Sequence, residues 1–410
     1  MAQCRLCDHE LKQSFCDLGM SPMANSYLAS EQLDRAEVFY PLHAYVCSNC
    51  LLVQLAVYES PDEIFGDYLY FSSYSEHWLQ HAKNYVQEAI RRFGMSESDQ
   101  VIEIASNDGY LLKNFVAAGI PALGIEPAAN VAAVAVEQGI PTEVGFFGTE
   151  MAARLVEQGT RADLLIGNNV FAHVPDLNDF VAGMAMVLAP EGRVTLEFPH
   201  LYQLIECNQF DTIYHEHFSY FSLLTATAAL EKHGLRVFDV EELPTHGGSL
   251  RVYACRAEAT RYLTSKRVSD VLRKESAIGL DTFDGHLDYS RQVEQVKHAL
   301  LQFLIDARQQ GARVAAYGAP AKGNTLLNYC GIRSDLIAYT VDRSPHKQGR
   351  FLPGTHLPIY GPDYLREARP DYIVVLPWNL RDEIIADLAY VKEWGGKFVV
   401  PIPKLEVLGA

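Results

Sequence analysis

Short apolar runs and helix-period segments alternate over two long stretches of the chain. In the first stretch, the apolar runs predict a strand over 101–104, a short strand that ends at Glu126, and strands over 143–144, 162–167 and 194–198. The segments between them predict helices over 111–118, 128–138, 151–157 and 177–188. Strands joined by helices are typical of a parallel sheet. The segment 237–256 predicts an antiparallel hairpin that closes this sheet.

The last hundred residues repeat the pattern. Strands are predicted over 313–317, 337–341, 372–376 and 398–401, with a helix over 380–394. Residues 258–310 have mainly helical periodicity, and their charged positions are typical of a solvated helix face. The pattern therefore predicts an α/β chain with two sheet domains joined by a helical bridge.

The turn after the first strand is built from small residues, which lets a ligand approach the backbone. Residues 105–109 (Ala-Ser-Asn-Asp-Gly) hold one glycine and an acid, whereas a pyrophosphate wants Gly-x-Gly-x-x-Gly at a helix start. The turn thus suits a ligand without phosphates, such as S-adenosylmethionine, with its sulfonium and zwitterionic tail. Glu126, 23 residues after Glu103, is placed to bind the ribose hydroxyls. A turn of unrelated function is the alternative.

The residues expected to bind this cofactor follow three strands whose carboxyl ends meet at one rim of the sheet. The strand over 162–167 ends in two asparagines and leads to His173 at the same rim. The cofactor-binding residues we predict are Glu103, Ala105, Asn107, Gly109, Glu126, Pro127, Asn168 and Asn169.

Composition narrows the class of protein. A formal net charge of −17 argues against a nucleic acid as the main partner, because binding phosphate backbones requires a basic face. No apolar run approaches the roughly 18–20 residues of a membrane span. The first residues lack the apolar core of a signal peptide, so we expect a cytoplasmic protein without membrane partners.

Four cysteines form two Cys-x-x-Cys pairs, Cys4 with Cys7 and Cys47 with Cys50. Each pair lets two thiolates reach one tetrahedral Zn²⁺ from a tight turn, and two turns complete a closed structural site. Disulfides are the alternative, disfavoured in the cytoplasm, and a redox motif is less typical of a duplicated pair. We therefore predict structural zinc.

The stretch 199–222 is aromatic but also carries titratable groups. Tyr214, Glu216 and His217 lie with His215 in a composition that suits neither a surface loop nor a plain core. We expect general acid–base chemistry here, because histidine can be tuned to operate near neutral pH. A catalytic metal is the alternative, although the histidines lack the helical spacing of three or four residues.

A second aromatic segment, 67–78, contains Tyr68, Tyr70 and Tyr74. Alternate tyrosines are often a packed sheet face. The same residues are also good hydrogen-bond donors to a sugar or an enolate oxygen.

Two turns in the carboxyl-terminal half are candidates for substrate binding. The first, 318–325, places Lys322, Asn324 and Thr325 at a helix start and forms a plausible phosphate cradle that is not a Walker loop. A plain strand–helix turn is its alternative. The second, 246–249, brings His246 toward a sugar or its phosphates, although turn chemistry alone accounts for its glycines.

Taken together, the motifs resemble a known family. They are CRLC…CSNC, YFSSYS, EIASNDGYLL, GIEP, NNVFAHVPD, YHEHFSYFS and YGAPAKGNTLL. Their order along the whole chain is similar to that of the S-adenosylmethionine-dependent sugar C-methyltransferases of deoxysugar biosynthesis. The resemblance implies a small amino-terminal zinc-binding domain, a central methyltransferase-type Rossmann-like sheet and a carboxyl-terminal Rossmann-like α/β domain.

We expect domain limits of 1–66 for the zinc-binding domain, 67–257 for the methyltransferase domain, 258–310 for the bridge and 311–410 for the carboxyl-terminal domain. The last domain is expected to bind the nucleotide sugar. The resemblance implies methylation of the carbon beside the ketone of a dTDP-linked 4-keto-6-deoxyhexose by a monomer or weak oligomer.

The implied reaction needs a base that removes the proton α to the ketone and donors for the enolate oxygen. His217 is the expected base, Tyr214 and Glu216 bind or polarise the sugar, and His173 completes the pocket with Tyr68, Tyr70 or Tyr74. Sugar O-methylation and a non-catalytic zinc-ribbon binding protein are the competing interpretations.

Overall fold

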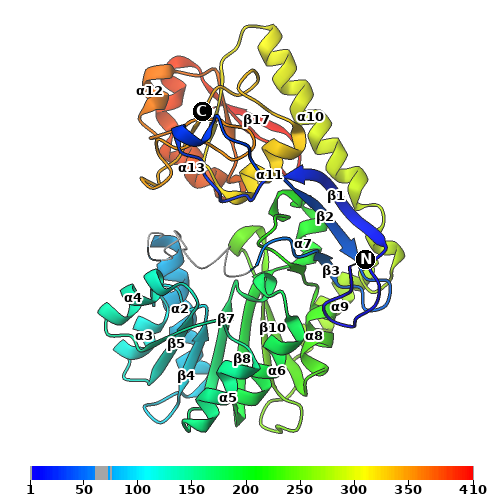
Figure 1. The fold of residues 1–410 in the computed structure, drawn as a ribbon, viewed down its shortest axis with the longest axis vertical. Helices are drawn as coiled ribbons and strands as arrows, with labels where there is room; N and C mark the ends of the chain where they lie inside the picture. The colour runs from blue at the N-terminus through cyan, green and yellow to red at the C-terminus, as the bar shows by residue number, and fades with distance from the viewer. Residues whose placement is uncertain (1, 61–72, 74–75, 410) are drawn as a thin grey trace.

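The computed structural model describes residues 2–60, 73 and 76–409, in three sheets (Figure 1). The central and carboxyl-terminal sheets form the two large bodies of the molecule, and the amino-terminal sheet lies beside them. The long helix α10 (Tyr289–Gln309) runs from the carboxyl-terminal body toward the amino-terminal sheet. No helix in these described ranges is both long enough and apolar enough to cross a membrane.

The central sheet has seven strands in the order β10-β11-β8-β7-β4-β5-β6. Its five strands from β4 to β8 run parallel, and β11 and β10 close it as the expected antiparallel hairpin. The strands are β4 (Val101–Ile104), β5 (Ala122–Glu126), β6 (Thr142–Val144), β7 (Ala162–Asn168), β8 (Leu188–Pro199), β10 (Leu235–Leu243) and β11 (Ser249–Arg256).

Amphipathic helices pack against the faces of this sheet, as the periodicity predicts. Their apolar sides, including Phe115 of α3 and Leu155 of α5, are fully buried. The helices are α2 (Glu76–Phe93), α3 (Leu112–Ala117), α4 (Ala129–Glu137), α5 (Thr149–Glu157), α6 (Leu177–Val187), α8 (Leu223–Glu231) and α9 (Lys266–Ala277).

Strand β8 begins earlier than the sequence suggests. It starts at Leu188 and includes the Ala-Pro-Glu-Gly segment that resembles a turn. The pairing of β7 with β8 jumps from Leu188 to Arg193, so the intervening residues form an irregularity inside the strand. Gly192 lies here, and a Cβ on it would come 2.6 Å from the carbonyl oxygen of Ala162.

The amino-terminal sheet is antiparallel, with the order β1-β2-β3-β9. Its strands are β1 (Gln13–Ser21), β2 (Tyr40–Val46), β3 (Val53–Leu55) and β9 (Ser219–Tyr220). The last of these comes from the aromatic stretch after β8, where Tyr220 pairs with Val53. The segment predicted to carry acid–base chemistry is therefore fastened to the amino-terminal domain.

The carboxyl-terminal sheet has six strands in the order β14-β13-β12-β15-β16-β17. The five from β14 to β16 are parallel, and β17 is antiparallel to β16. The strands are β12 (Val314–Tyr317), β13 (Thr340–Val341), β14 (Ile359–Tyr360), β15 (Tyr372–Val375), β16 (Lys397–Val400) and β17 (Glu406–Gly409). The sequence analysis missed β14 and β17, which are short or at the edge.

The helices of this domain differ from the prediction at one place. The helix expected over 380–394 is divided into α13 (Arg381–Asp387) and a 3₁₀ helix (Ala389–Trp394). The remaining helices are α11 (Ala321–Cys330), α12 (Tyr364–Ala368) and, between the domains, α7 (Leu201–Glu206). One apolar core joins this domain to α10 and the amino-terminal sheet through residues such as Phe15 and Leu300.

Candidate active site

A cavity of about 620 Å³ opens at the carboxyl ends of the central strands. Its wall includes the turn after β4, the ends of β5 and β7, the aromatic stretch after β8, and the first residues of α11. The amino-terminal domain contributes Asn25. This location agrees with the rule that open α/β sheets bind ligands beyond the carboxyl ends of their strands.

The turn after β4 contains three residues in the left-handed backbone region, which glycine and asparagine tolerate and alanine disfavours. Ala105, Asn107 and Gly109 all have positive φ, of 55°, 51° and 75°. A Cβ on Gly109 would lie 2.3 Å from the Cδ1 atom of Ile140, so this position requires glycine for space as well as conformation. The tight turn brings the backbone of Ala105 and Asn107 to the cavity wall.

Glu126, with the following Pro127, lines the same part of the cavity. One carboxylate oxygen of Glu126 accepts a 2.9 Å hydrogen bond from the Asn107 N–H, and the other accepts one of 2.9 Å from the Ala128 N–H. Burial raises its pKa, against these two hydrogen bonds, which favour the charged form. Each oxygen retains a further lone pair, so the carboxylate is able to accept hydroxyl groups of a ligand.

Two other predicted cofactor residues lie behind this wall. Glu103 is 1% exposed, and burial, with the charges of Glu126 and Asp108 nearby, raises its pKa well above the usual range. Neither Glu103 nor Gly109 lines the cavity. Asn168 and Asn169, in contrast, do line it.

His217 is held in an orientation that suits a base. Its Nδ1 atom lies 2.8 Å from the carbonyl oxygen of Thr212, and because a carbonyl only accepts, Nδ1 carries the hydrogen. Burial and the neighbouring His173 lower its pKa well below the usual range. The ring is therefore neutral, with a lone pair on Nε2.

Tyr214 and His173 flank this imidazole within the cavity wall. Their ring centroids lie 4.0 Å and 4.7 Å from that of His217. Burial lowers the pKa of His173 to about 4, so this ring is also neutral. Three of the predicted catalytic side chains are thus brought together.

Glu216 reaches the cavity beside them. Its Oε1 atom accepts a 2.7 Å hydrogen bond from the Asn25 side chain, and burial raises its pKa to about 7. His215, between Tyr214 and Glu216, points elsewhere: its Nε2 contacts the Pro41 carbonyl oxygen at 3.2 Å. The two histidines of one short motif therefore serve different parts of the molecule.

Two lysines enter the cavity from the carboxyl-terminal domain, Lys322 and Lys347. Lys322 contacts the Asn379 side-chain oxygen and lies 4.4 Å from the ring centre of Trp378. Burial lowers its pKa to about 8, against the charge of Asp211. The sequence analysis missed Lys347, whose position five residues after the acid at the end of β13 is the only local signal.

Asn324 and Thr325 do not line the cavity. Both are buried, and their side chains donate hydrogen bonds to the Ala24 and Ile213 carbonyl oxygens, at 2.6 Å and 3.1 Å. They fasten α11 to two other domains instead of facing a ligand in this structure. Of the three residues predicted for the phosphate cradle, Lys322 alone lines the cavity, and Lys347 lines it as well.

His246 lies at the cavity wall in a turn with positive φ (56°). Its ring is 5.2 Å from that of Trp78, another lining residue that the sequence analysis missed. Trp78 stacks on His81 at 4.9 Å. Both aromatic residues of this pair belong to the first turns of α2.

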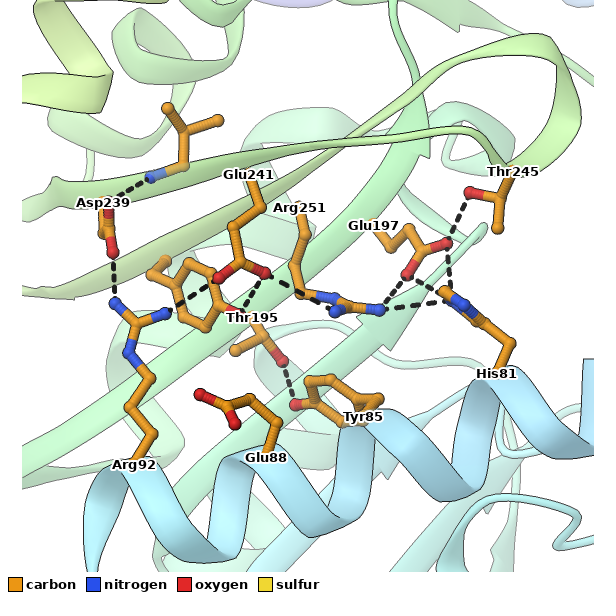
Figure 2. A network of polar contacts seen from close by, with 12 residues as sticks. His81, Tyr85, Glu88, Arg92, Thr195, Glu197, Asp239, Glu241, Thr245 and Arg251 are labelled. Atoms are coloured by element: carbon orange, nitrogen blue, oxygen red, sulfur yellow. Dashed lines mark hydrogen bonds and ion pairs between the residues drawn. The ribbon is translucent and has the colours of Figure 1, made fainter.

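A buried polar network fixes α2 and the His246 turn (Figure 2). The Glu197 carboxylate accepts hydrogen bonds from Arg251 at 2.6 Å and Thr245 at 2.9 Å, and His81 lies 3.0 Å from both of its oxygens. Burial alone would raise the pKa of Glu197, but His81 and Arg251 lower it to about 2. The network explains how Trp78 and His246 are kept against the cavity.

The four paired cysteines gather at the outer end of the amino-terminal sheet. All four sulfur atoms lie within 4.8 Å of one another, as ligands of one tetrahedral zinc ion do. Over the part of the chain that the structure describes, this is the cluster found with enough close ligand atoms for a metal. Tyr68, Tyr70 and Tyr74, by contrast, lie outside the described residues.

Comparison with known proteins gives a match along the whole chain. Three family models match: a zinc binding domain over residues 4–65, a methyltransferase domain over 77–240 and a C-methyltransferase C-terminal domain over 244–403. The C-methyltransferase NovU of Streptomyces niveus is 36% identical over 408 residues, covering 100% of this chain and 97% of that protein.

Solved structures match less than half of the chain. The magnesium protoporphyrin IX methyltransferase ChlM of Synechocystis PCC 6803 is 14% identical, with a TM-score of 0.35, over 43% of this chain and 83% of that one. An S-adenosylmethionine-dependent methyltransferase of Mesorhizobium loti is 15% identical, with a TM-score of 0.34, over 43% and 100%. On the full-length match to NovU and the three domain matches, the chain belongs to the S-adenosylmethionine-dependent sugar C-methyltransferase family that its motifs resemble.

Proposed function

We propose that this C-methyltransferase acts on a carbon next to the ketone of a dTDP-linked 4-keto-6-deoxy sugar, with His217 as the base. The observation that carries the proposal is the set of groups that line one cavity. Glu126 comes from the central domain, Lys322 and Lys347 come from the carboxyl-terminal domain, and the neutral imidazole of His217 lies in the same wall.

The part of the cavity wall that contains Glu126 suits the cofactor. S-adenosylmethionine supplies the methyl group when it is bound. Glu126 accepts the ribose hydroxyls, while Asn107, Asn168 and Asn169 offer polar groups to the rest of the cofactor. Glu103 and Gly109 support this turn from behind: the first is buried beneath it, and the second gives it the space to close.

The part of the cavity wall that contains Lys322 and Lys347 suits the nucleotide part of the substrate. Lys322 and Lys347 line the cavity wall contributed by the carboxyl-terminal domain, and ammonium groups bind phosphate oxygens by charge-assisted hydrogen bonds. This division supports assigning cofactor binding to residues 67–257 and nucleotide-sugar binding to residues 311–410, with the zinc-binding domain at 1–66 and the bridge at 258–310.

The chemistry needs a base, and the Nε2 lone pair of His217 meets that need. It accepts the proton from the carbon α to the ketone, and the electron pair of that C–H bond passes into the enolate. The nucleophilic carbon then forms a bond to the methyl carbon while the sulfur–carbon bond breaks toward sulfur. Tyr214 and His173, which flank the base, are placed to donate to or orient the sugar oxygens.

The test is turnover of a dTDP-4-keto-6-deoxy sugar deuterated at the carbons that flank the ketone. We expect a product that carries one additional methyl group on carbon and has lost one deuterium, identified by mass spectrometry and NMR. A product methylated on oxygen with all deuterium retained contradicts the proposed site of methylation. Binding of both ligands without turnover contradicts the choice of substrate.

A further inference from the structure

A loop of the zinc-binding domain crosses to the other two domains. The loop follows β1, and its residues 24–28 dock on the carboxyl-terminal domain. The Ala24 carbonyl oxygen accepts the bond from Asn324, the Tyr27 hydroxyl donates to the Ala319 carbonyl oxygen at 2.5 Å, and Leu28 pairs with Phe351. These contacts hold both sides of Asn25 in place.

Asn25 faces the catalytic cavity from this loop. Its Nδ2 atom lies 2.7 Å from the Oε1 atom of Glu216, which is 5% exposed. An ionised carboxylate only accepts hydrogen bonds, so the amide presents its NH₂ group to Glu216. The bond joins residues 191 positions apart in the chain.

We infer that Asn25 is a positioning residue that orients the Glu216 side chain in the cavity that His217 also lines. The inference rests on the proposed function, because it assumes that Glu216 contacts the sugar. It also gives the zinc-binding domain a part in the active site, since its loop supplies the partner of a cavity carboxylate.

The electrostatic setting makes the Asn25 bond important. Burial raises the pKa of Glu216 to about 7, and the hydrogen bond from Asn25 opposes that rise. Removing the amide is therefore expected to raise the pKa further and leave more of the carboxyl protonated at neutral pH. The titratable groups that share its cavity or act on it are Tyr214 and His217 on its own segment, the acids Glu126, Asp176 and Asp179, and Tyr27, His173, His246, Lys322 and Lys347.

The first test is the pH dependence of kcat/KM for Asn25→Ala with the keto-sugar substrate. We expect the acid-side limb to move to higher pH, with a loss of about 10-fold or more at pH 7 that recovers as the pH rises. A loosened structure would lower activity at every pH and would not recover. Asn25→Asp, which places a second negative charge against the carboxyl, should move the limb in the same direction.

Asn324→Ala is the matched control. It removes an amide hydrogen bond that docks the same loop, at the Ala24 carbonyl oxygen, and Asn324 does not line the cavity, so it should leave the limb in place. An unshifted limb in Asn25→Ala overturns the inference, as does a shift of the same size in Asn324→Ala. Higher activity of Asn25→Ala at pH 7 also overturns it, because Glu216 would then act in its protonated form.

A second measurement needs no turnover. Carbon-13 NMR of protein labelled in the glutamate side-chain carboxyls, with Glu216→Gln to assign the resonance, should show the Glu216 titration at higher pH in Asn25→Ala than in the parent. An unchanged titration overturns the inference alone. Absence of turnover in the parent enzyme, with the expected NMR shift, would instead remove the proposed function.

Discussion

In both the central and the carboxyl-terminal domain, an acid at the end of the second strand holds the turn after the first strand. The charged side chains around the two turns are of opposite sign. In the β4-α3-β5 unit the second strand ends in the acid Glu126. In the β12-α11-β13 unit the acid Asp342 directly follows the second strand. Each carboxylate accepts one bond from the turn after the first strand, at Asn107 or Ala319, and one from the N–H two residues after itself. The four distances lie between 2.7 and 2.9 Å.

The charged side chains around the two turns differ. The central turn contains Asp108 and contributes no lysine or arginine to the cavity wall. The carboxyl-terminal turn leads into Lys322, and Lys347 follows Asp342 and donates a 2.9 Å bond to the Ala319 carbonyl oxygen. In both domains the acid organises the turn. Under the proposed function, the cations of the carboxyl-terminal domain would favour a phosphate-bearing ligand there.

The largest effect on the protein is expected from loss of the zinc site, which should not distinguish the two ligand-binding domains. Cys47→Ser removes one of four zinc ligands, and structural zinc contributes roughly 10 kcal/mol or more to such domains. We expect a lower yield and a lower thermal unfolding temperature, with both ligands affected alike in the protein that folds. Elemental analysis that finds no zinc in freshly purified, reduced parent protein would remove this prediction.

The next largest effect should fall on the affinity for one of the two ligands only. Lys322→Met and Lys347→Met each remove a cation, so we expect affinity for the dTDP-sugar to fall by about 10- to 100-fold, as for lost charge-assisted hydrogen bonds. Affinity for S-adenosylhomocysteine should stay unchanged. Lys297→Met is the control, because Lys297 lies over the Tyr329 ring and outside the cavity. Calorimetry measures both affinities. Equal weakening of the binding of both ligands would contradict the assignment of the dTDP-sugar to the carboxyl-terminal domain.

A smaller and reciprocal effect should follow from the two acids. Glu126→Ala should weaken S-adenosylhomocysteine by about 10-fold, since ribose hydroxyls lose an acceptor, and leave the dTDP-sugar nearly intact. Asp342→Ala should do the reverse, because Ala319 and with it Lys347 lose their support. Identical binding profiles for these two variants would contradict a division of ligands between the domains.

The smallest expected effect is a pH dependence of substrate binding. The pKa of Lys322 is lowered to about 8 by burial, so its ammonium is charged below pH 8 and neutral above it. Binding of the dTDP-sugar should weaken a few-fold as the pH rises through this range, whereas S-adenosylhomocysteine binding should not. Lys322→Met should remove the dependence; if it persists in that variant, another group is responsible.

The sequence predicts best what depends on local pattern. Most strands of both parallel sheets, the cysteine pairs and the turn after β4 are encoded within short segments, whereas β14 is too short to give a pattern of its own. The partners of the predicted phosphate residues could not be read this way, because Asn324 and Thr325 bond to carbonyl groups 300 and 112 positions away. Asn25 belongs to a segment with no chemical motif, and only the tertiary fold brings it to the cavity. Trp78 ends the aromatic segment 67–78, in which the prediction names only the tyrosines.

The motif at 214–217 shows the same limit within four residues. Its composition predicts acid–base chemistry, and His217 does face the cavity. His215 instead bonds to the Pro41 carbonyl, because β9, just after the motif, pairs with β3 of the amino-terminal sheet. Sequence alone could not distinguish the two rings, since their difference arises from long-range strand pairing.

The most direct test of His217 as the base is hydrogen exchange at the carbon beside the ketone, measured separately from methyl transfer. With S-adenosylhomocysteine in place of the methyl donor, the parent enzyme should exchange the α-hydrogen of the bound keto-sugar for solvent deuterium, as NMR would show. His217→Asn should bind both ligands yet lose exchange and methylation by roughly 10²–10⁴-fold, the scale expected for a general base. Exchange and methylation at close to the parental rate in His217→Asn would contradict the account and place the base elsewhere.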